Sequence, residues 1–134
     1  MRKLAATAFS LLAVAAMASQ PQTNVSGVEV YYRSFDSTSI VNLDAKALIG
    51  AHDRHLVISK PSQVKALLGA LGQPCNSVPP WQAQDLRLLI LVGGSHPWRW
   101  EASNFAYRDS RTGATCLLSS SQQSHLLALL GLER

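Results

Sequence analysis

Two cysteines, Cys75 and Cys116, are the only ones in this chain, and they constrain its fold more than any other residues. In an exported chain, one pair without a leftover thiol is expected to form one disulfide. Metal ligation or a redox pair would need a closer spacing. A bridge that closes a loop of this length restricts the unfolded chain by about 4 kcal/mol in the entropic model, which is large for a small domain. We therefore predict a structural disulfide, Cys75–Cys116.

Export itself is predicted by the first 18 residues. A basic start at Arg2 and Lys3, an apolar run over residues 4–17 and small residues up to Ala18 are typical of a cleaved secretory signal peptide. The run is shorter than the roughly 20 apolar residues that span a bilayer, so we expect no membrane anchor. No cysteine at the cleavage site could carry a lipid, and we expect a soluble mature protein. The alanine-rich signal favours the periplasm, with secretion as the alternative.

Length and composition predict one compact domain behind this leader. The chain has 134 residues, of which 47% are apolar and 15% charged, and these values exclude a long multidomain enzyme, a coiled coil or a disordered tail. We divide it into a signal peptide (1–18), a disordered leader (19–27) and a single domain (28–134). Beyond residue 18, ten basic and eight acidic residues leave a net charge of +2. They are interspersed, so we expect no nucleic-acid partner.

Alternation of apolar and polar residues predicts the first part of a sheet. Val28, Val30 and Tyr32 alternate with residues 29, 31 and 33, which are Glu, Tyr and Arg. This pattern predicts a half-buried strand that we expect to end near Phe35. A second strand near Ile40, Val41 and Leu43 is expected to pair back on it. A short helix over residues 45–51 and a short strand over 55–58 follow in this prediction.

One helix is predicted by spacing alone. Apolar residues at positions 64, 67, 68 and 71 fall on one helical face, Ser59 and Ser62 are candidate N-caps, and Gly72 ends the helix. The apolar face must pack on a sheet or on another helix to leave water. The loop that follows contains Cys75, and we expect the disulfide to fix it in place.

The second half of the chain predicts an antiparallel meander and a final helix. An almost unbroken apolar run over residues 86–92 indicates a central strand, and strands over 98–107 and 114–118 follow, with turns between them. Ser120 and Gln123 resemble a capping box, and a stripe of Leu126, Leu129 and Leu130 precedes Gly131. The sequence thus predicts an α+β fold: an antiparallel sheet of about four to six strands, two amphipathic helices packed on one face, and one disulfide.

The aromatic residues between positions 98 and 107 stand at both even and odd positions of the sequence. On a single strand, Trp98 and Trp100 would face one side and Phe105 and Tyr107 the other. Either a bulge or turn near residues 103–104 sends all four rings to one core, or one pair lies exposed as a binding surface. For the second case we predict a protein contact at this turn, because exposed tryptophan and arginine often anchor interfaces. Its residues would be His96, Trp98, Arg99 and Trp100.

Catalytic alternatives rest on weaker patterns. His52 and His55 are three residues apart, with Asp53 as a third ligand, but the pattern lacks the glutamate of the His-Glu-x-x-His zinc signature. Ser62 and Lys65 match Ser-x-x-Lys without its companion motifs. Ser95 and His96 are adjacent, so on an extended chain they would point to opposite faces.

Two functions from different classes remain, and a structural or assembly subunit of the envelope, which rests on the same evidence as the first, is a third. The first is a small exported binding protein, of the inhibitor or immunity type, which acts by contact with another exported protein and needs no cofactor. The second is a small hydrolase or metal-dependent enzyme that uses the His52, Asp53 and His55 region or His96. The sequence leaves the oligomeric state and the strand order open.

Overall fold

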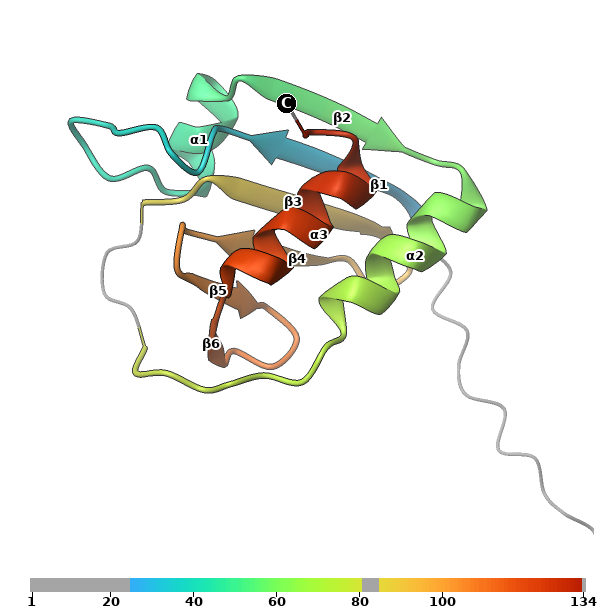
Figure 1. Ribbon diagram of the computed structural model, residues 1–134. Coiled ribbons are helices and arrows are strands. Elements are labelled where there is room, and N and C mark those ends of the chain that lie inside the picture. The colour runs from blue at the N-terminus through green and yellow to red at the C-terminus, as the bar shows by residue number, and fades with distance from the viewer. Residues whose placement is uncertain (1–24, 81–84, 134) are drawn as a thin grey trace, which may run out of the picture.

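The computed structural model describes residues 25–80 and 85–133, so the predicted signal peptide lies outside the described residues. The helices and strands of the described residues follow one another as β1 (Val25–Tyr32), α1 (Ala45–Ala51), β2 (Arg54–Ile58), α2 (Pro61–Leu71), β3 (Leu88–Gly94), β4 (Trp98–Ala102), β5 (Ala106–Asp109), β6 (Thr115–Leu117) and α3 (Ser120–Leu130) (Figure 1). Within these residues, no helix is long and apolar enough to cross a membrane.

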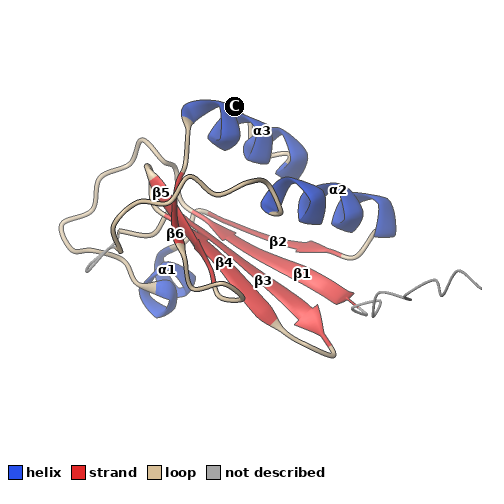
Figure 2. Ribbon diagram, turned by 90° about the horizontal axis from the view of Figure 1, so that it is seen from below, coloured by secondary structure: helices blue, strands red, loops and turns tan. Residues whose placement is uncertain are grey.

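The strands form one antiparallel six-stranded sheet, and the predicted α+β class is confirmed. The strand order is β2-β1-β3-β4-β5-β6. Strands β3 to β6 form a meander, β1 pairs with the free edge of β3, and β2 pairs with β1 at the end of the sheet. Helices α2 and α3 cover one side of the sheet, as predicted, and α1 lies on the other side (Figure 2). We call these the α2/α3 side and the α1 side.

The larger part of the core lies on the α2/α3 side. Val28 and Val30 of β1 point there and are almost completely buried, which confirms the predicted alternation. The apolar face of α2 and the residues Leu126 and Leu130 of α3 pack onto the same cluster, while Leu127 takes part in place of the predicted Leu129. A smaller cluster on the α1 side contains Leu43, Leu48, Leu86 and Leu89.

The strand predicted near residues 40–43 is wrong. No strand forms there, because β1 already has β2 and β3 as its two neighbours. Ile40 is fully exposed, and Leu43 belongs to the small cluster that contains Leu48 of α1. The carboxylate of Asp85 organises this loop: it accepts hydrogen bonds from the Ser39 hydroxyl at 2.9 Å and from the backbone N–H of Leu43 at 2.9 Å. It also pairs with the buried guanidinium of Arg87 at 2.6 Å.

Four predicted ends of helices and strands also change. Strand β1 begins at Val25, inside the segment expected to be a disordered leader, because residues 25–32 pair with β3. It ends at Tyr32, before Phe35. The N-cap of α2 is Lys60, without a side-chain hydrogen bond, so Ser59 and Ser62 have no capping role. The capping box of α3 is formed by Ser119 and Gln122, one residue before the predicted pair Ser120 and Gln123.

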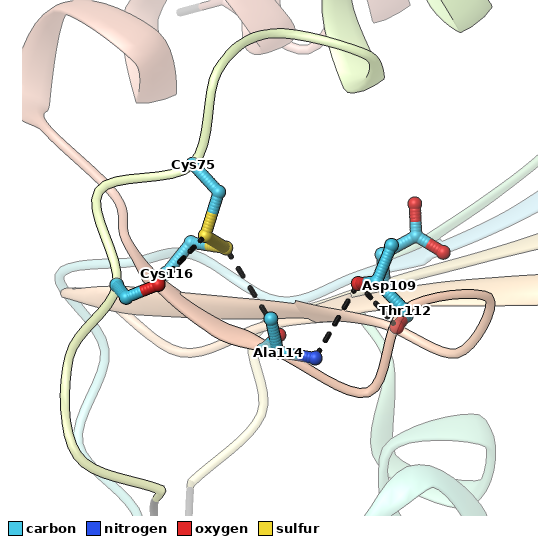
Figure 3. The surroundings of a disulfide bond; sticks show 6 residues. Cys75, Asp109, Thr112, Ala114 and Cys116 are labelled. Carbon is cyan, nitrogen blue, oxygen red and sulfur yellow. Dashed lines mark hydrogen bonds between the residues drawn. A yellow bond between two sulfur atoms is a disulfide. The ribbon is translucent and has the colours of Figure 1, made fainter.

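The disulfide Cys75–Cys116 is confirmed and joins the loop after α2 to strand β6 (Figure 3). Backbone hydrogen bonds continue the attachment on both sides of the bridge. The N–H of Leu117 donates to the carbonyl of Asn76 at 2.8 Å, and the N–H of Val78 donates to the carbonyl of Thr115 at 3.0 Å. The loop thus lies along the edge of β6. A disulfide is stable in oxidising compartments, so it is consistent with an extracellular location.

Candidate functional site

The turn near residues 103–104 determines which of the aromatic side chains face the core. Strands β4 and β5 form a hairpin, and the Ser103 hydroxyl accepts a hydrogen bond from the N–H of Ala106 at 3.2 Å. Trp100 and Tyr107 stack at a centroid distance of 4.9 Å, and both are buried on the α2/α3 side. Phe105 is 53% exposed at the turn. The hairpin therefore brings Trp100 and Tyr107 to one core and leaves Phe105 outside it.

The four residues predicted to bind a partner do not share one surface. Trp100 is only 2% exposed and belongs to the core. Trp98 is half-buried on the same side, and the guanidinium of Arg111 lies 3.5 Å above its ring, within cation–π range. Arg99 points to the α1 side, and His96 is exposed in the turn between β3 and β4. Binding by Trp98, Arg99 and His96 stays a prediction.

A buried carboxylate between two arginines marks the α1 side of β4 and β5. The Glu101 side chain is 3% exposed, whereas those of Arg99 and Arg108 are 51% and 38% exposed. Arg108 Nε donates to Glu101 Oε1 at 2.7 Å, and Arg99 Nε lies 3.9 Å from Glu101 Oε2. One carboxylate thus orients two guanidinium groups that remain accessible to water. The exposed charge of this part of the sheet is positive.

Exposed apolar side chains are unevenly distributed. Of the six large ones among the described residues, five lie on the α1 side of the sheet, on α1 or in the loop that leads into α1: Ile40, Val41, Ile49, Val57 and Leu117. Val57 is 66% exposed and faces the same side as its cross-strand partner Glu29. Next to Glu29 across the sheet lies the half-buried Leu91 of β3. We call Val57, Leu91, Arg99 and Arg108 the open sheet surface.

The two histidines of the weak metal pattern lie beside Tyr31 on the α1 side. His55 stacks on Tyr31 at 4.4 Å, and the ring of His52 meets Tyr31 edge-on at 5.3 Å. The hydroxyl of Tyr31 donates to Glu29 Oε2 at 3.1 Å, and this hydrogen bond, with lesser contributions from burial and the negative charge of Glu29, raises the pKa of Tyr31. His55 Nε2 lies 3.7 Å from the same carboxylate. The cluster is exposed and polar.

The structure brings together two residues of the enzyme alternative, His52 and His55, whose ring centroids lie 5.9 Å apart. Asp53 accepts a hydrogen bond from the N–H of Ser34, and His52 contacts the carbonyl of Ile49. No group of three His, Cys, Asp or Glu side chains in residues 25–80 and 85–133 could hold a metal ion. His96 follows β3 at the opposite end of the sheet from His55, about 20 Å away along six strand residues. A metal-dependent site thus has no ligand set in this part of the chain.

The pairing of Glu101 with Arg108 could have been found in the sequence. Once the turn is placed over residues 103–106, the two residues are equally distant from it and must face each other across the hairpin. The exposure of Val57 had no local signal, since a run of Leu56, Val57 and Ile58 does not tell which face is covered. No family model, no curated protein and no solved structure matches the chain.

Proposed function

We propose that this chain is a small exported binding protein that acts by contact with another exported protein through the open sheet surface. The observation that carries the proposal is a row of neighbouring side chains across the α1 side of the sheet, Val57, Glu29, Leu91 and Arg99, in which Val57 is 66% exposed. Exposed apolar area that is bordered by charged groups is typical of protein-binding sites. The opposite side of the sheet is already covered by α2 and α3.

The charge of the surface specifies the chemistry of the partner. Arg99 and Arg108 present guanidinium groups whose shared counter-ion, Glu101, is buried beneath them. Arg108 already donates to Glu101 through Nε and Nη2, so Arg99 is the guanidinium that we expect to meet a carboxylate of the partner. The partner is therefore a protein that presents an apolar contact to Val57 and an acidic residue to Arg99. An inhibitor or immunity protein of the periplasm, or a secreted one, fits this description.

The disulfide supports the location. Cytosolic proteins rarely keep a structural disulfide, so the bridge between Cys75 and Cys116 favours an oxidising compartment. Among oxidising compartments, the predicted alanine-rich signal peptide favours the periplasm.

Affinity capture with matched variants tests the proposal. The oxidised protein serves as bait for envelope and culture extracts, and retained proteins are identified by mass spectrometry. Val57→Asp and Arg99→Ala alter the open sheet surface, whereas Lys65→Ala removes an exposed charge from α2 on the other side. We expect a stoichiometric partner that the unchanged protein and the Lys65 variant retain and that both surface variants lose. A partner that all three variants retain, or no partner for any folded bait, would contradict the proposal.

A further inference from the structure

The two outer edges of the sheet differ. The edge of β6 is occupied by the loop after α2: the N–H of Leu117 donates to the carbonyl of Asn76 at 2.8 Å, and the N–H of Val78 donates to the carbonyl of Thr115 at 3.0 Å. Strand β2 forms the opposite edge (Figure 1), and within the described chain β1 is its neighbour in the sheet. Unpaired backbone groups along such an edge are a template for another strand.

The backbone groups of β2 that face this edge follow from the alternation of hydrogen bonds in an antiparallel sheet. The N–H of Arg33 donates to the carbonyl of Arg87 at 2.8 Å, which continues the register of β1 with β3. Odd-numbered residues of β1 therefore bond to β3, and even-numbered ones bond to residues 54, 56 and 58 of β2. The N–H and C=O groups of His55 and Val57 point away from the sheet.

Strand β2 lacks most of the features that keep an edge from pairing. Such edges are commonly protected by proline, a bulge, charged side chains or a covering segment. Residues 54–58 contain no proline, pair with β1 in an unbroken register and carry one formal charge, on Arg54 at their end. In the part of the chain that the structure describes, no segment outside the sheet makes a backbone hydrogen bond to His55 or Val57. The edge is thus able to accept another strand.

We propose that two copies of this chain pair through β2, antiparallel, about a two-fold axis at Leu56. In this register His55 of each copy lies opposite Val57 of the other, so the outward-facing residues of both copies exchange their backbone hydrogen bonds. Opposite residues share a face of the sheet. The exposed Val57 therefore lies beside His55 of the other copy, and the half-buried Leu56 meets its own counterpart on the α2/α3 side.

The two neighbouring registers are less favourable. A pairing centred on position 57 places Arg54 opposite Lys60 of the other copy, and like charges directly opposite each other destabilise a sheet. A pairing centred on position 55 places Val57 opposite Asp53, whose N–H already donates to the carbonyl of Tyr32 at 2.9 Å. The register centred on position 56 pairs all the outward groups and opposes no like charges.

This pairing uses the edge of the sheet and does not depend on the proposed contact of its face. The α1 sides of the two copies become continuous, because opposite residues of paired strands point to the same side. The open sheet surfaces of the two copies then lie next to each other. The purified protein alone is sufficient to test the pairing, so its failure is distinguishable from failure of the proposed function.

Sedimentation equilibrium of the purified, oxidised protein measures the association. We expect mainly dimer at about 0.5 mM, as suits a small interface. Val57→Pro removes an outward N–H at a position where an edge strand tolerates proline, and it should leave a folded monomer. Val57→Thr has nearly the same shape and keeps the N–H, so its dimerisation constant should stay within about fivefold of the unchanged value.

Cysteine cross-linking tests the register. In the proposed pairing the two positions 56 face each other without mutual hydrogen bonds, with Cα atoms about 4.5 Å apart, which permits a disulfide. We therefore expect Leu56→Cys to form a linked dimer under mild oxidation. Ile58→Cys, also half-buried and opposite position 54, should stay unlinked. Peptide mass spectrometry verifies that the Cys75–Cys116 bridge is intact in both variants.

Three results would each overturn the proposal: a monomer at about 0.5 mM, a folded Val57→Pro protein that dimerises like the unchanged one, or equal linkage at positions 56 and 58. Circular dichroism verifies the fold of each variant. If Val57→Pro does not fold, sedimentation of the unchanged protein and the two cysteine variants decide the matter.

Discussion

Arg99 and Trp100 are neighbours in the chain but belong to opposite sides of the sheet. Successive side chains of a strand alternate, so Trp100 stacks on Tyr107 in the core, while Arg99 is exposed on the α1 side beside the buried Glu101. Tryptophan is common at interfaces, but Trp100 is a core residue here. Its burial in the fold, and not its residue type, distinguishes a core role from a binding role.

Truncation of the two side chains should therefore have unequal effects on stability. We expect Trp100→Ala to lower the free energy of unfolding by about 4 kcal/mol, since it removes a large buried ring and leaves a cavity. Arg99→Ala, at an exposed position, should change it by less than about 1 kcal/mol. Urea unfolding followed by circular dichroism measures both. A Trp100→Ala protein as stable as the unchanged one would contradict the core placement.

Asp85 holds the loop before α1 through its contacts with Ser39, Leu43 and Arg87. We expect Asp85→Ala to lower the free energy of unfolding by about 3 kcal/mol, because the buried guanidinium of Arg87 would lose its counter-ion. Asp36→Ala, which removes an exposed carboxylate from the same loop, should change it by about 0.5 kcal/mol or less. Equal losses in the two variants would refute this role of Asp85.

The stabilisation by Asp85 also depends on pH. Burial alone would raise the pKa of its carboxyl, but hydrogen bonds from Leu43, Arg87 and Ser39, with the charge of Arg87, hold the pKa below its ordinary value. The contribution is therefore complete above the unfolded pKa of about 3.9 and is lost as the pH falls through the lower pKa of the folded state. The difference in stability between the unchanged protein and Asp85→Ala should accordingly shrink below about pH 4.

At the scale of elements, helix ends show what a local pattern can and cannot specify. The sequence predicts a capping box and a final glycine for α3, but serines at 119–121 followed by two glutamines offer two frames with the same spacing. The structure uses Ser119 with Gln122. The predicted strand near residues 40–43 fails for a different reason, since pairing partners of β1 come from distant parts of the chain.

Two glycines of the helices should respond to alanine in opposite directions. Gly131 ends α3 with a φ of 65°, in the left-handed region that favours glycine, so Gly131→Ala should lower the free energy of unfolding by about 1 kcal/mol. Gly69 lies inside α2 with open space around its missing Cβ, so Gly69→Ala should raise it by about 0.5 to 1 kcal/mol. Thermal unfolding gives both signs. The same sign for both would contradict the assigned conformations.

At the scale of the whole molecule, the sequence predicts the parts better than their arrangement. Cysteine count predicts the disulfide, an almost unbroken apolar run predicts β3, and periodicity predicts α2 and α3. The placement of β1 between β2 and β3 has no local signal, because it depends on pairing between residues 25–32 and residues 88–94. The assignment of α1 to the side opposite α2 and α3 follows from that arrangement, and so does the open sheet surface.

The disulfide should contribute to the stability of the entire domain. The bridge spans a sequence separation of 41 residues, and in the entropic model such a cross-link stabilises the folded state by about 4 kcal/mol. Unfolding of the oxidised protein and of a Cys75→Ser, Cys116→Ser double variant measures this difference. A loss below about 1 kcal/mol would mean that the loop after α2 is held by its backbone hydrogen bonds to β6.

The central claim is that the two sides of the sheet have different tasks: the α2/α3 side forms the core, and the open sheet surface binds a protein. Hydrogen–deuterium exchange of the protein, alone and with its captured partner, tests this most directly. We expect slower exchange in the complex over β2, β3, β4 and β5, which carry Val57, Leu91, Arg99 and Arg108, with exchange over α2 and α3 unchanged. Protection confined to α2 and α3 would contradict the claim and place the contact on the opposite side.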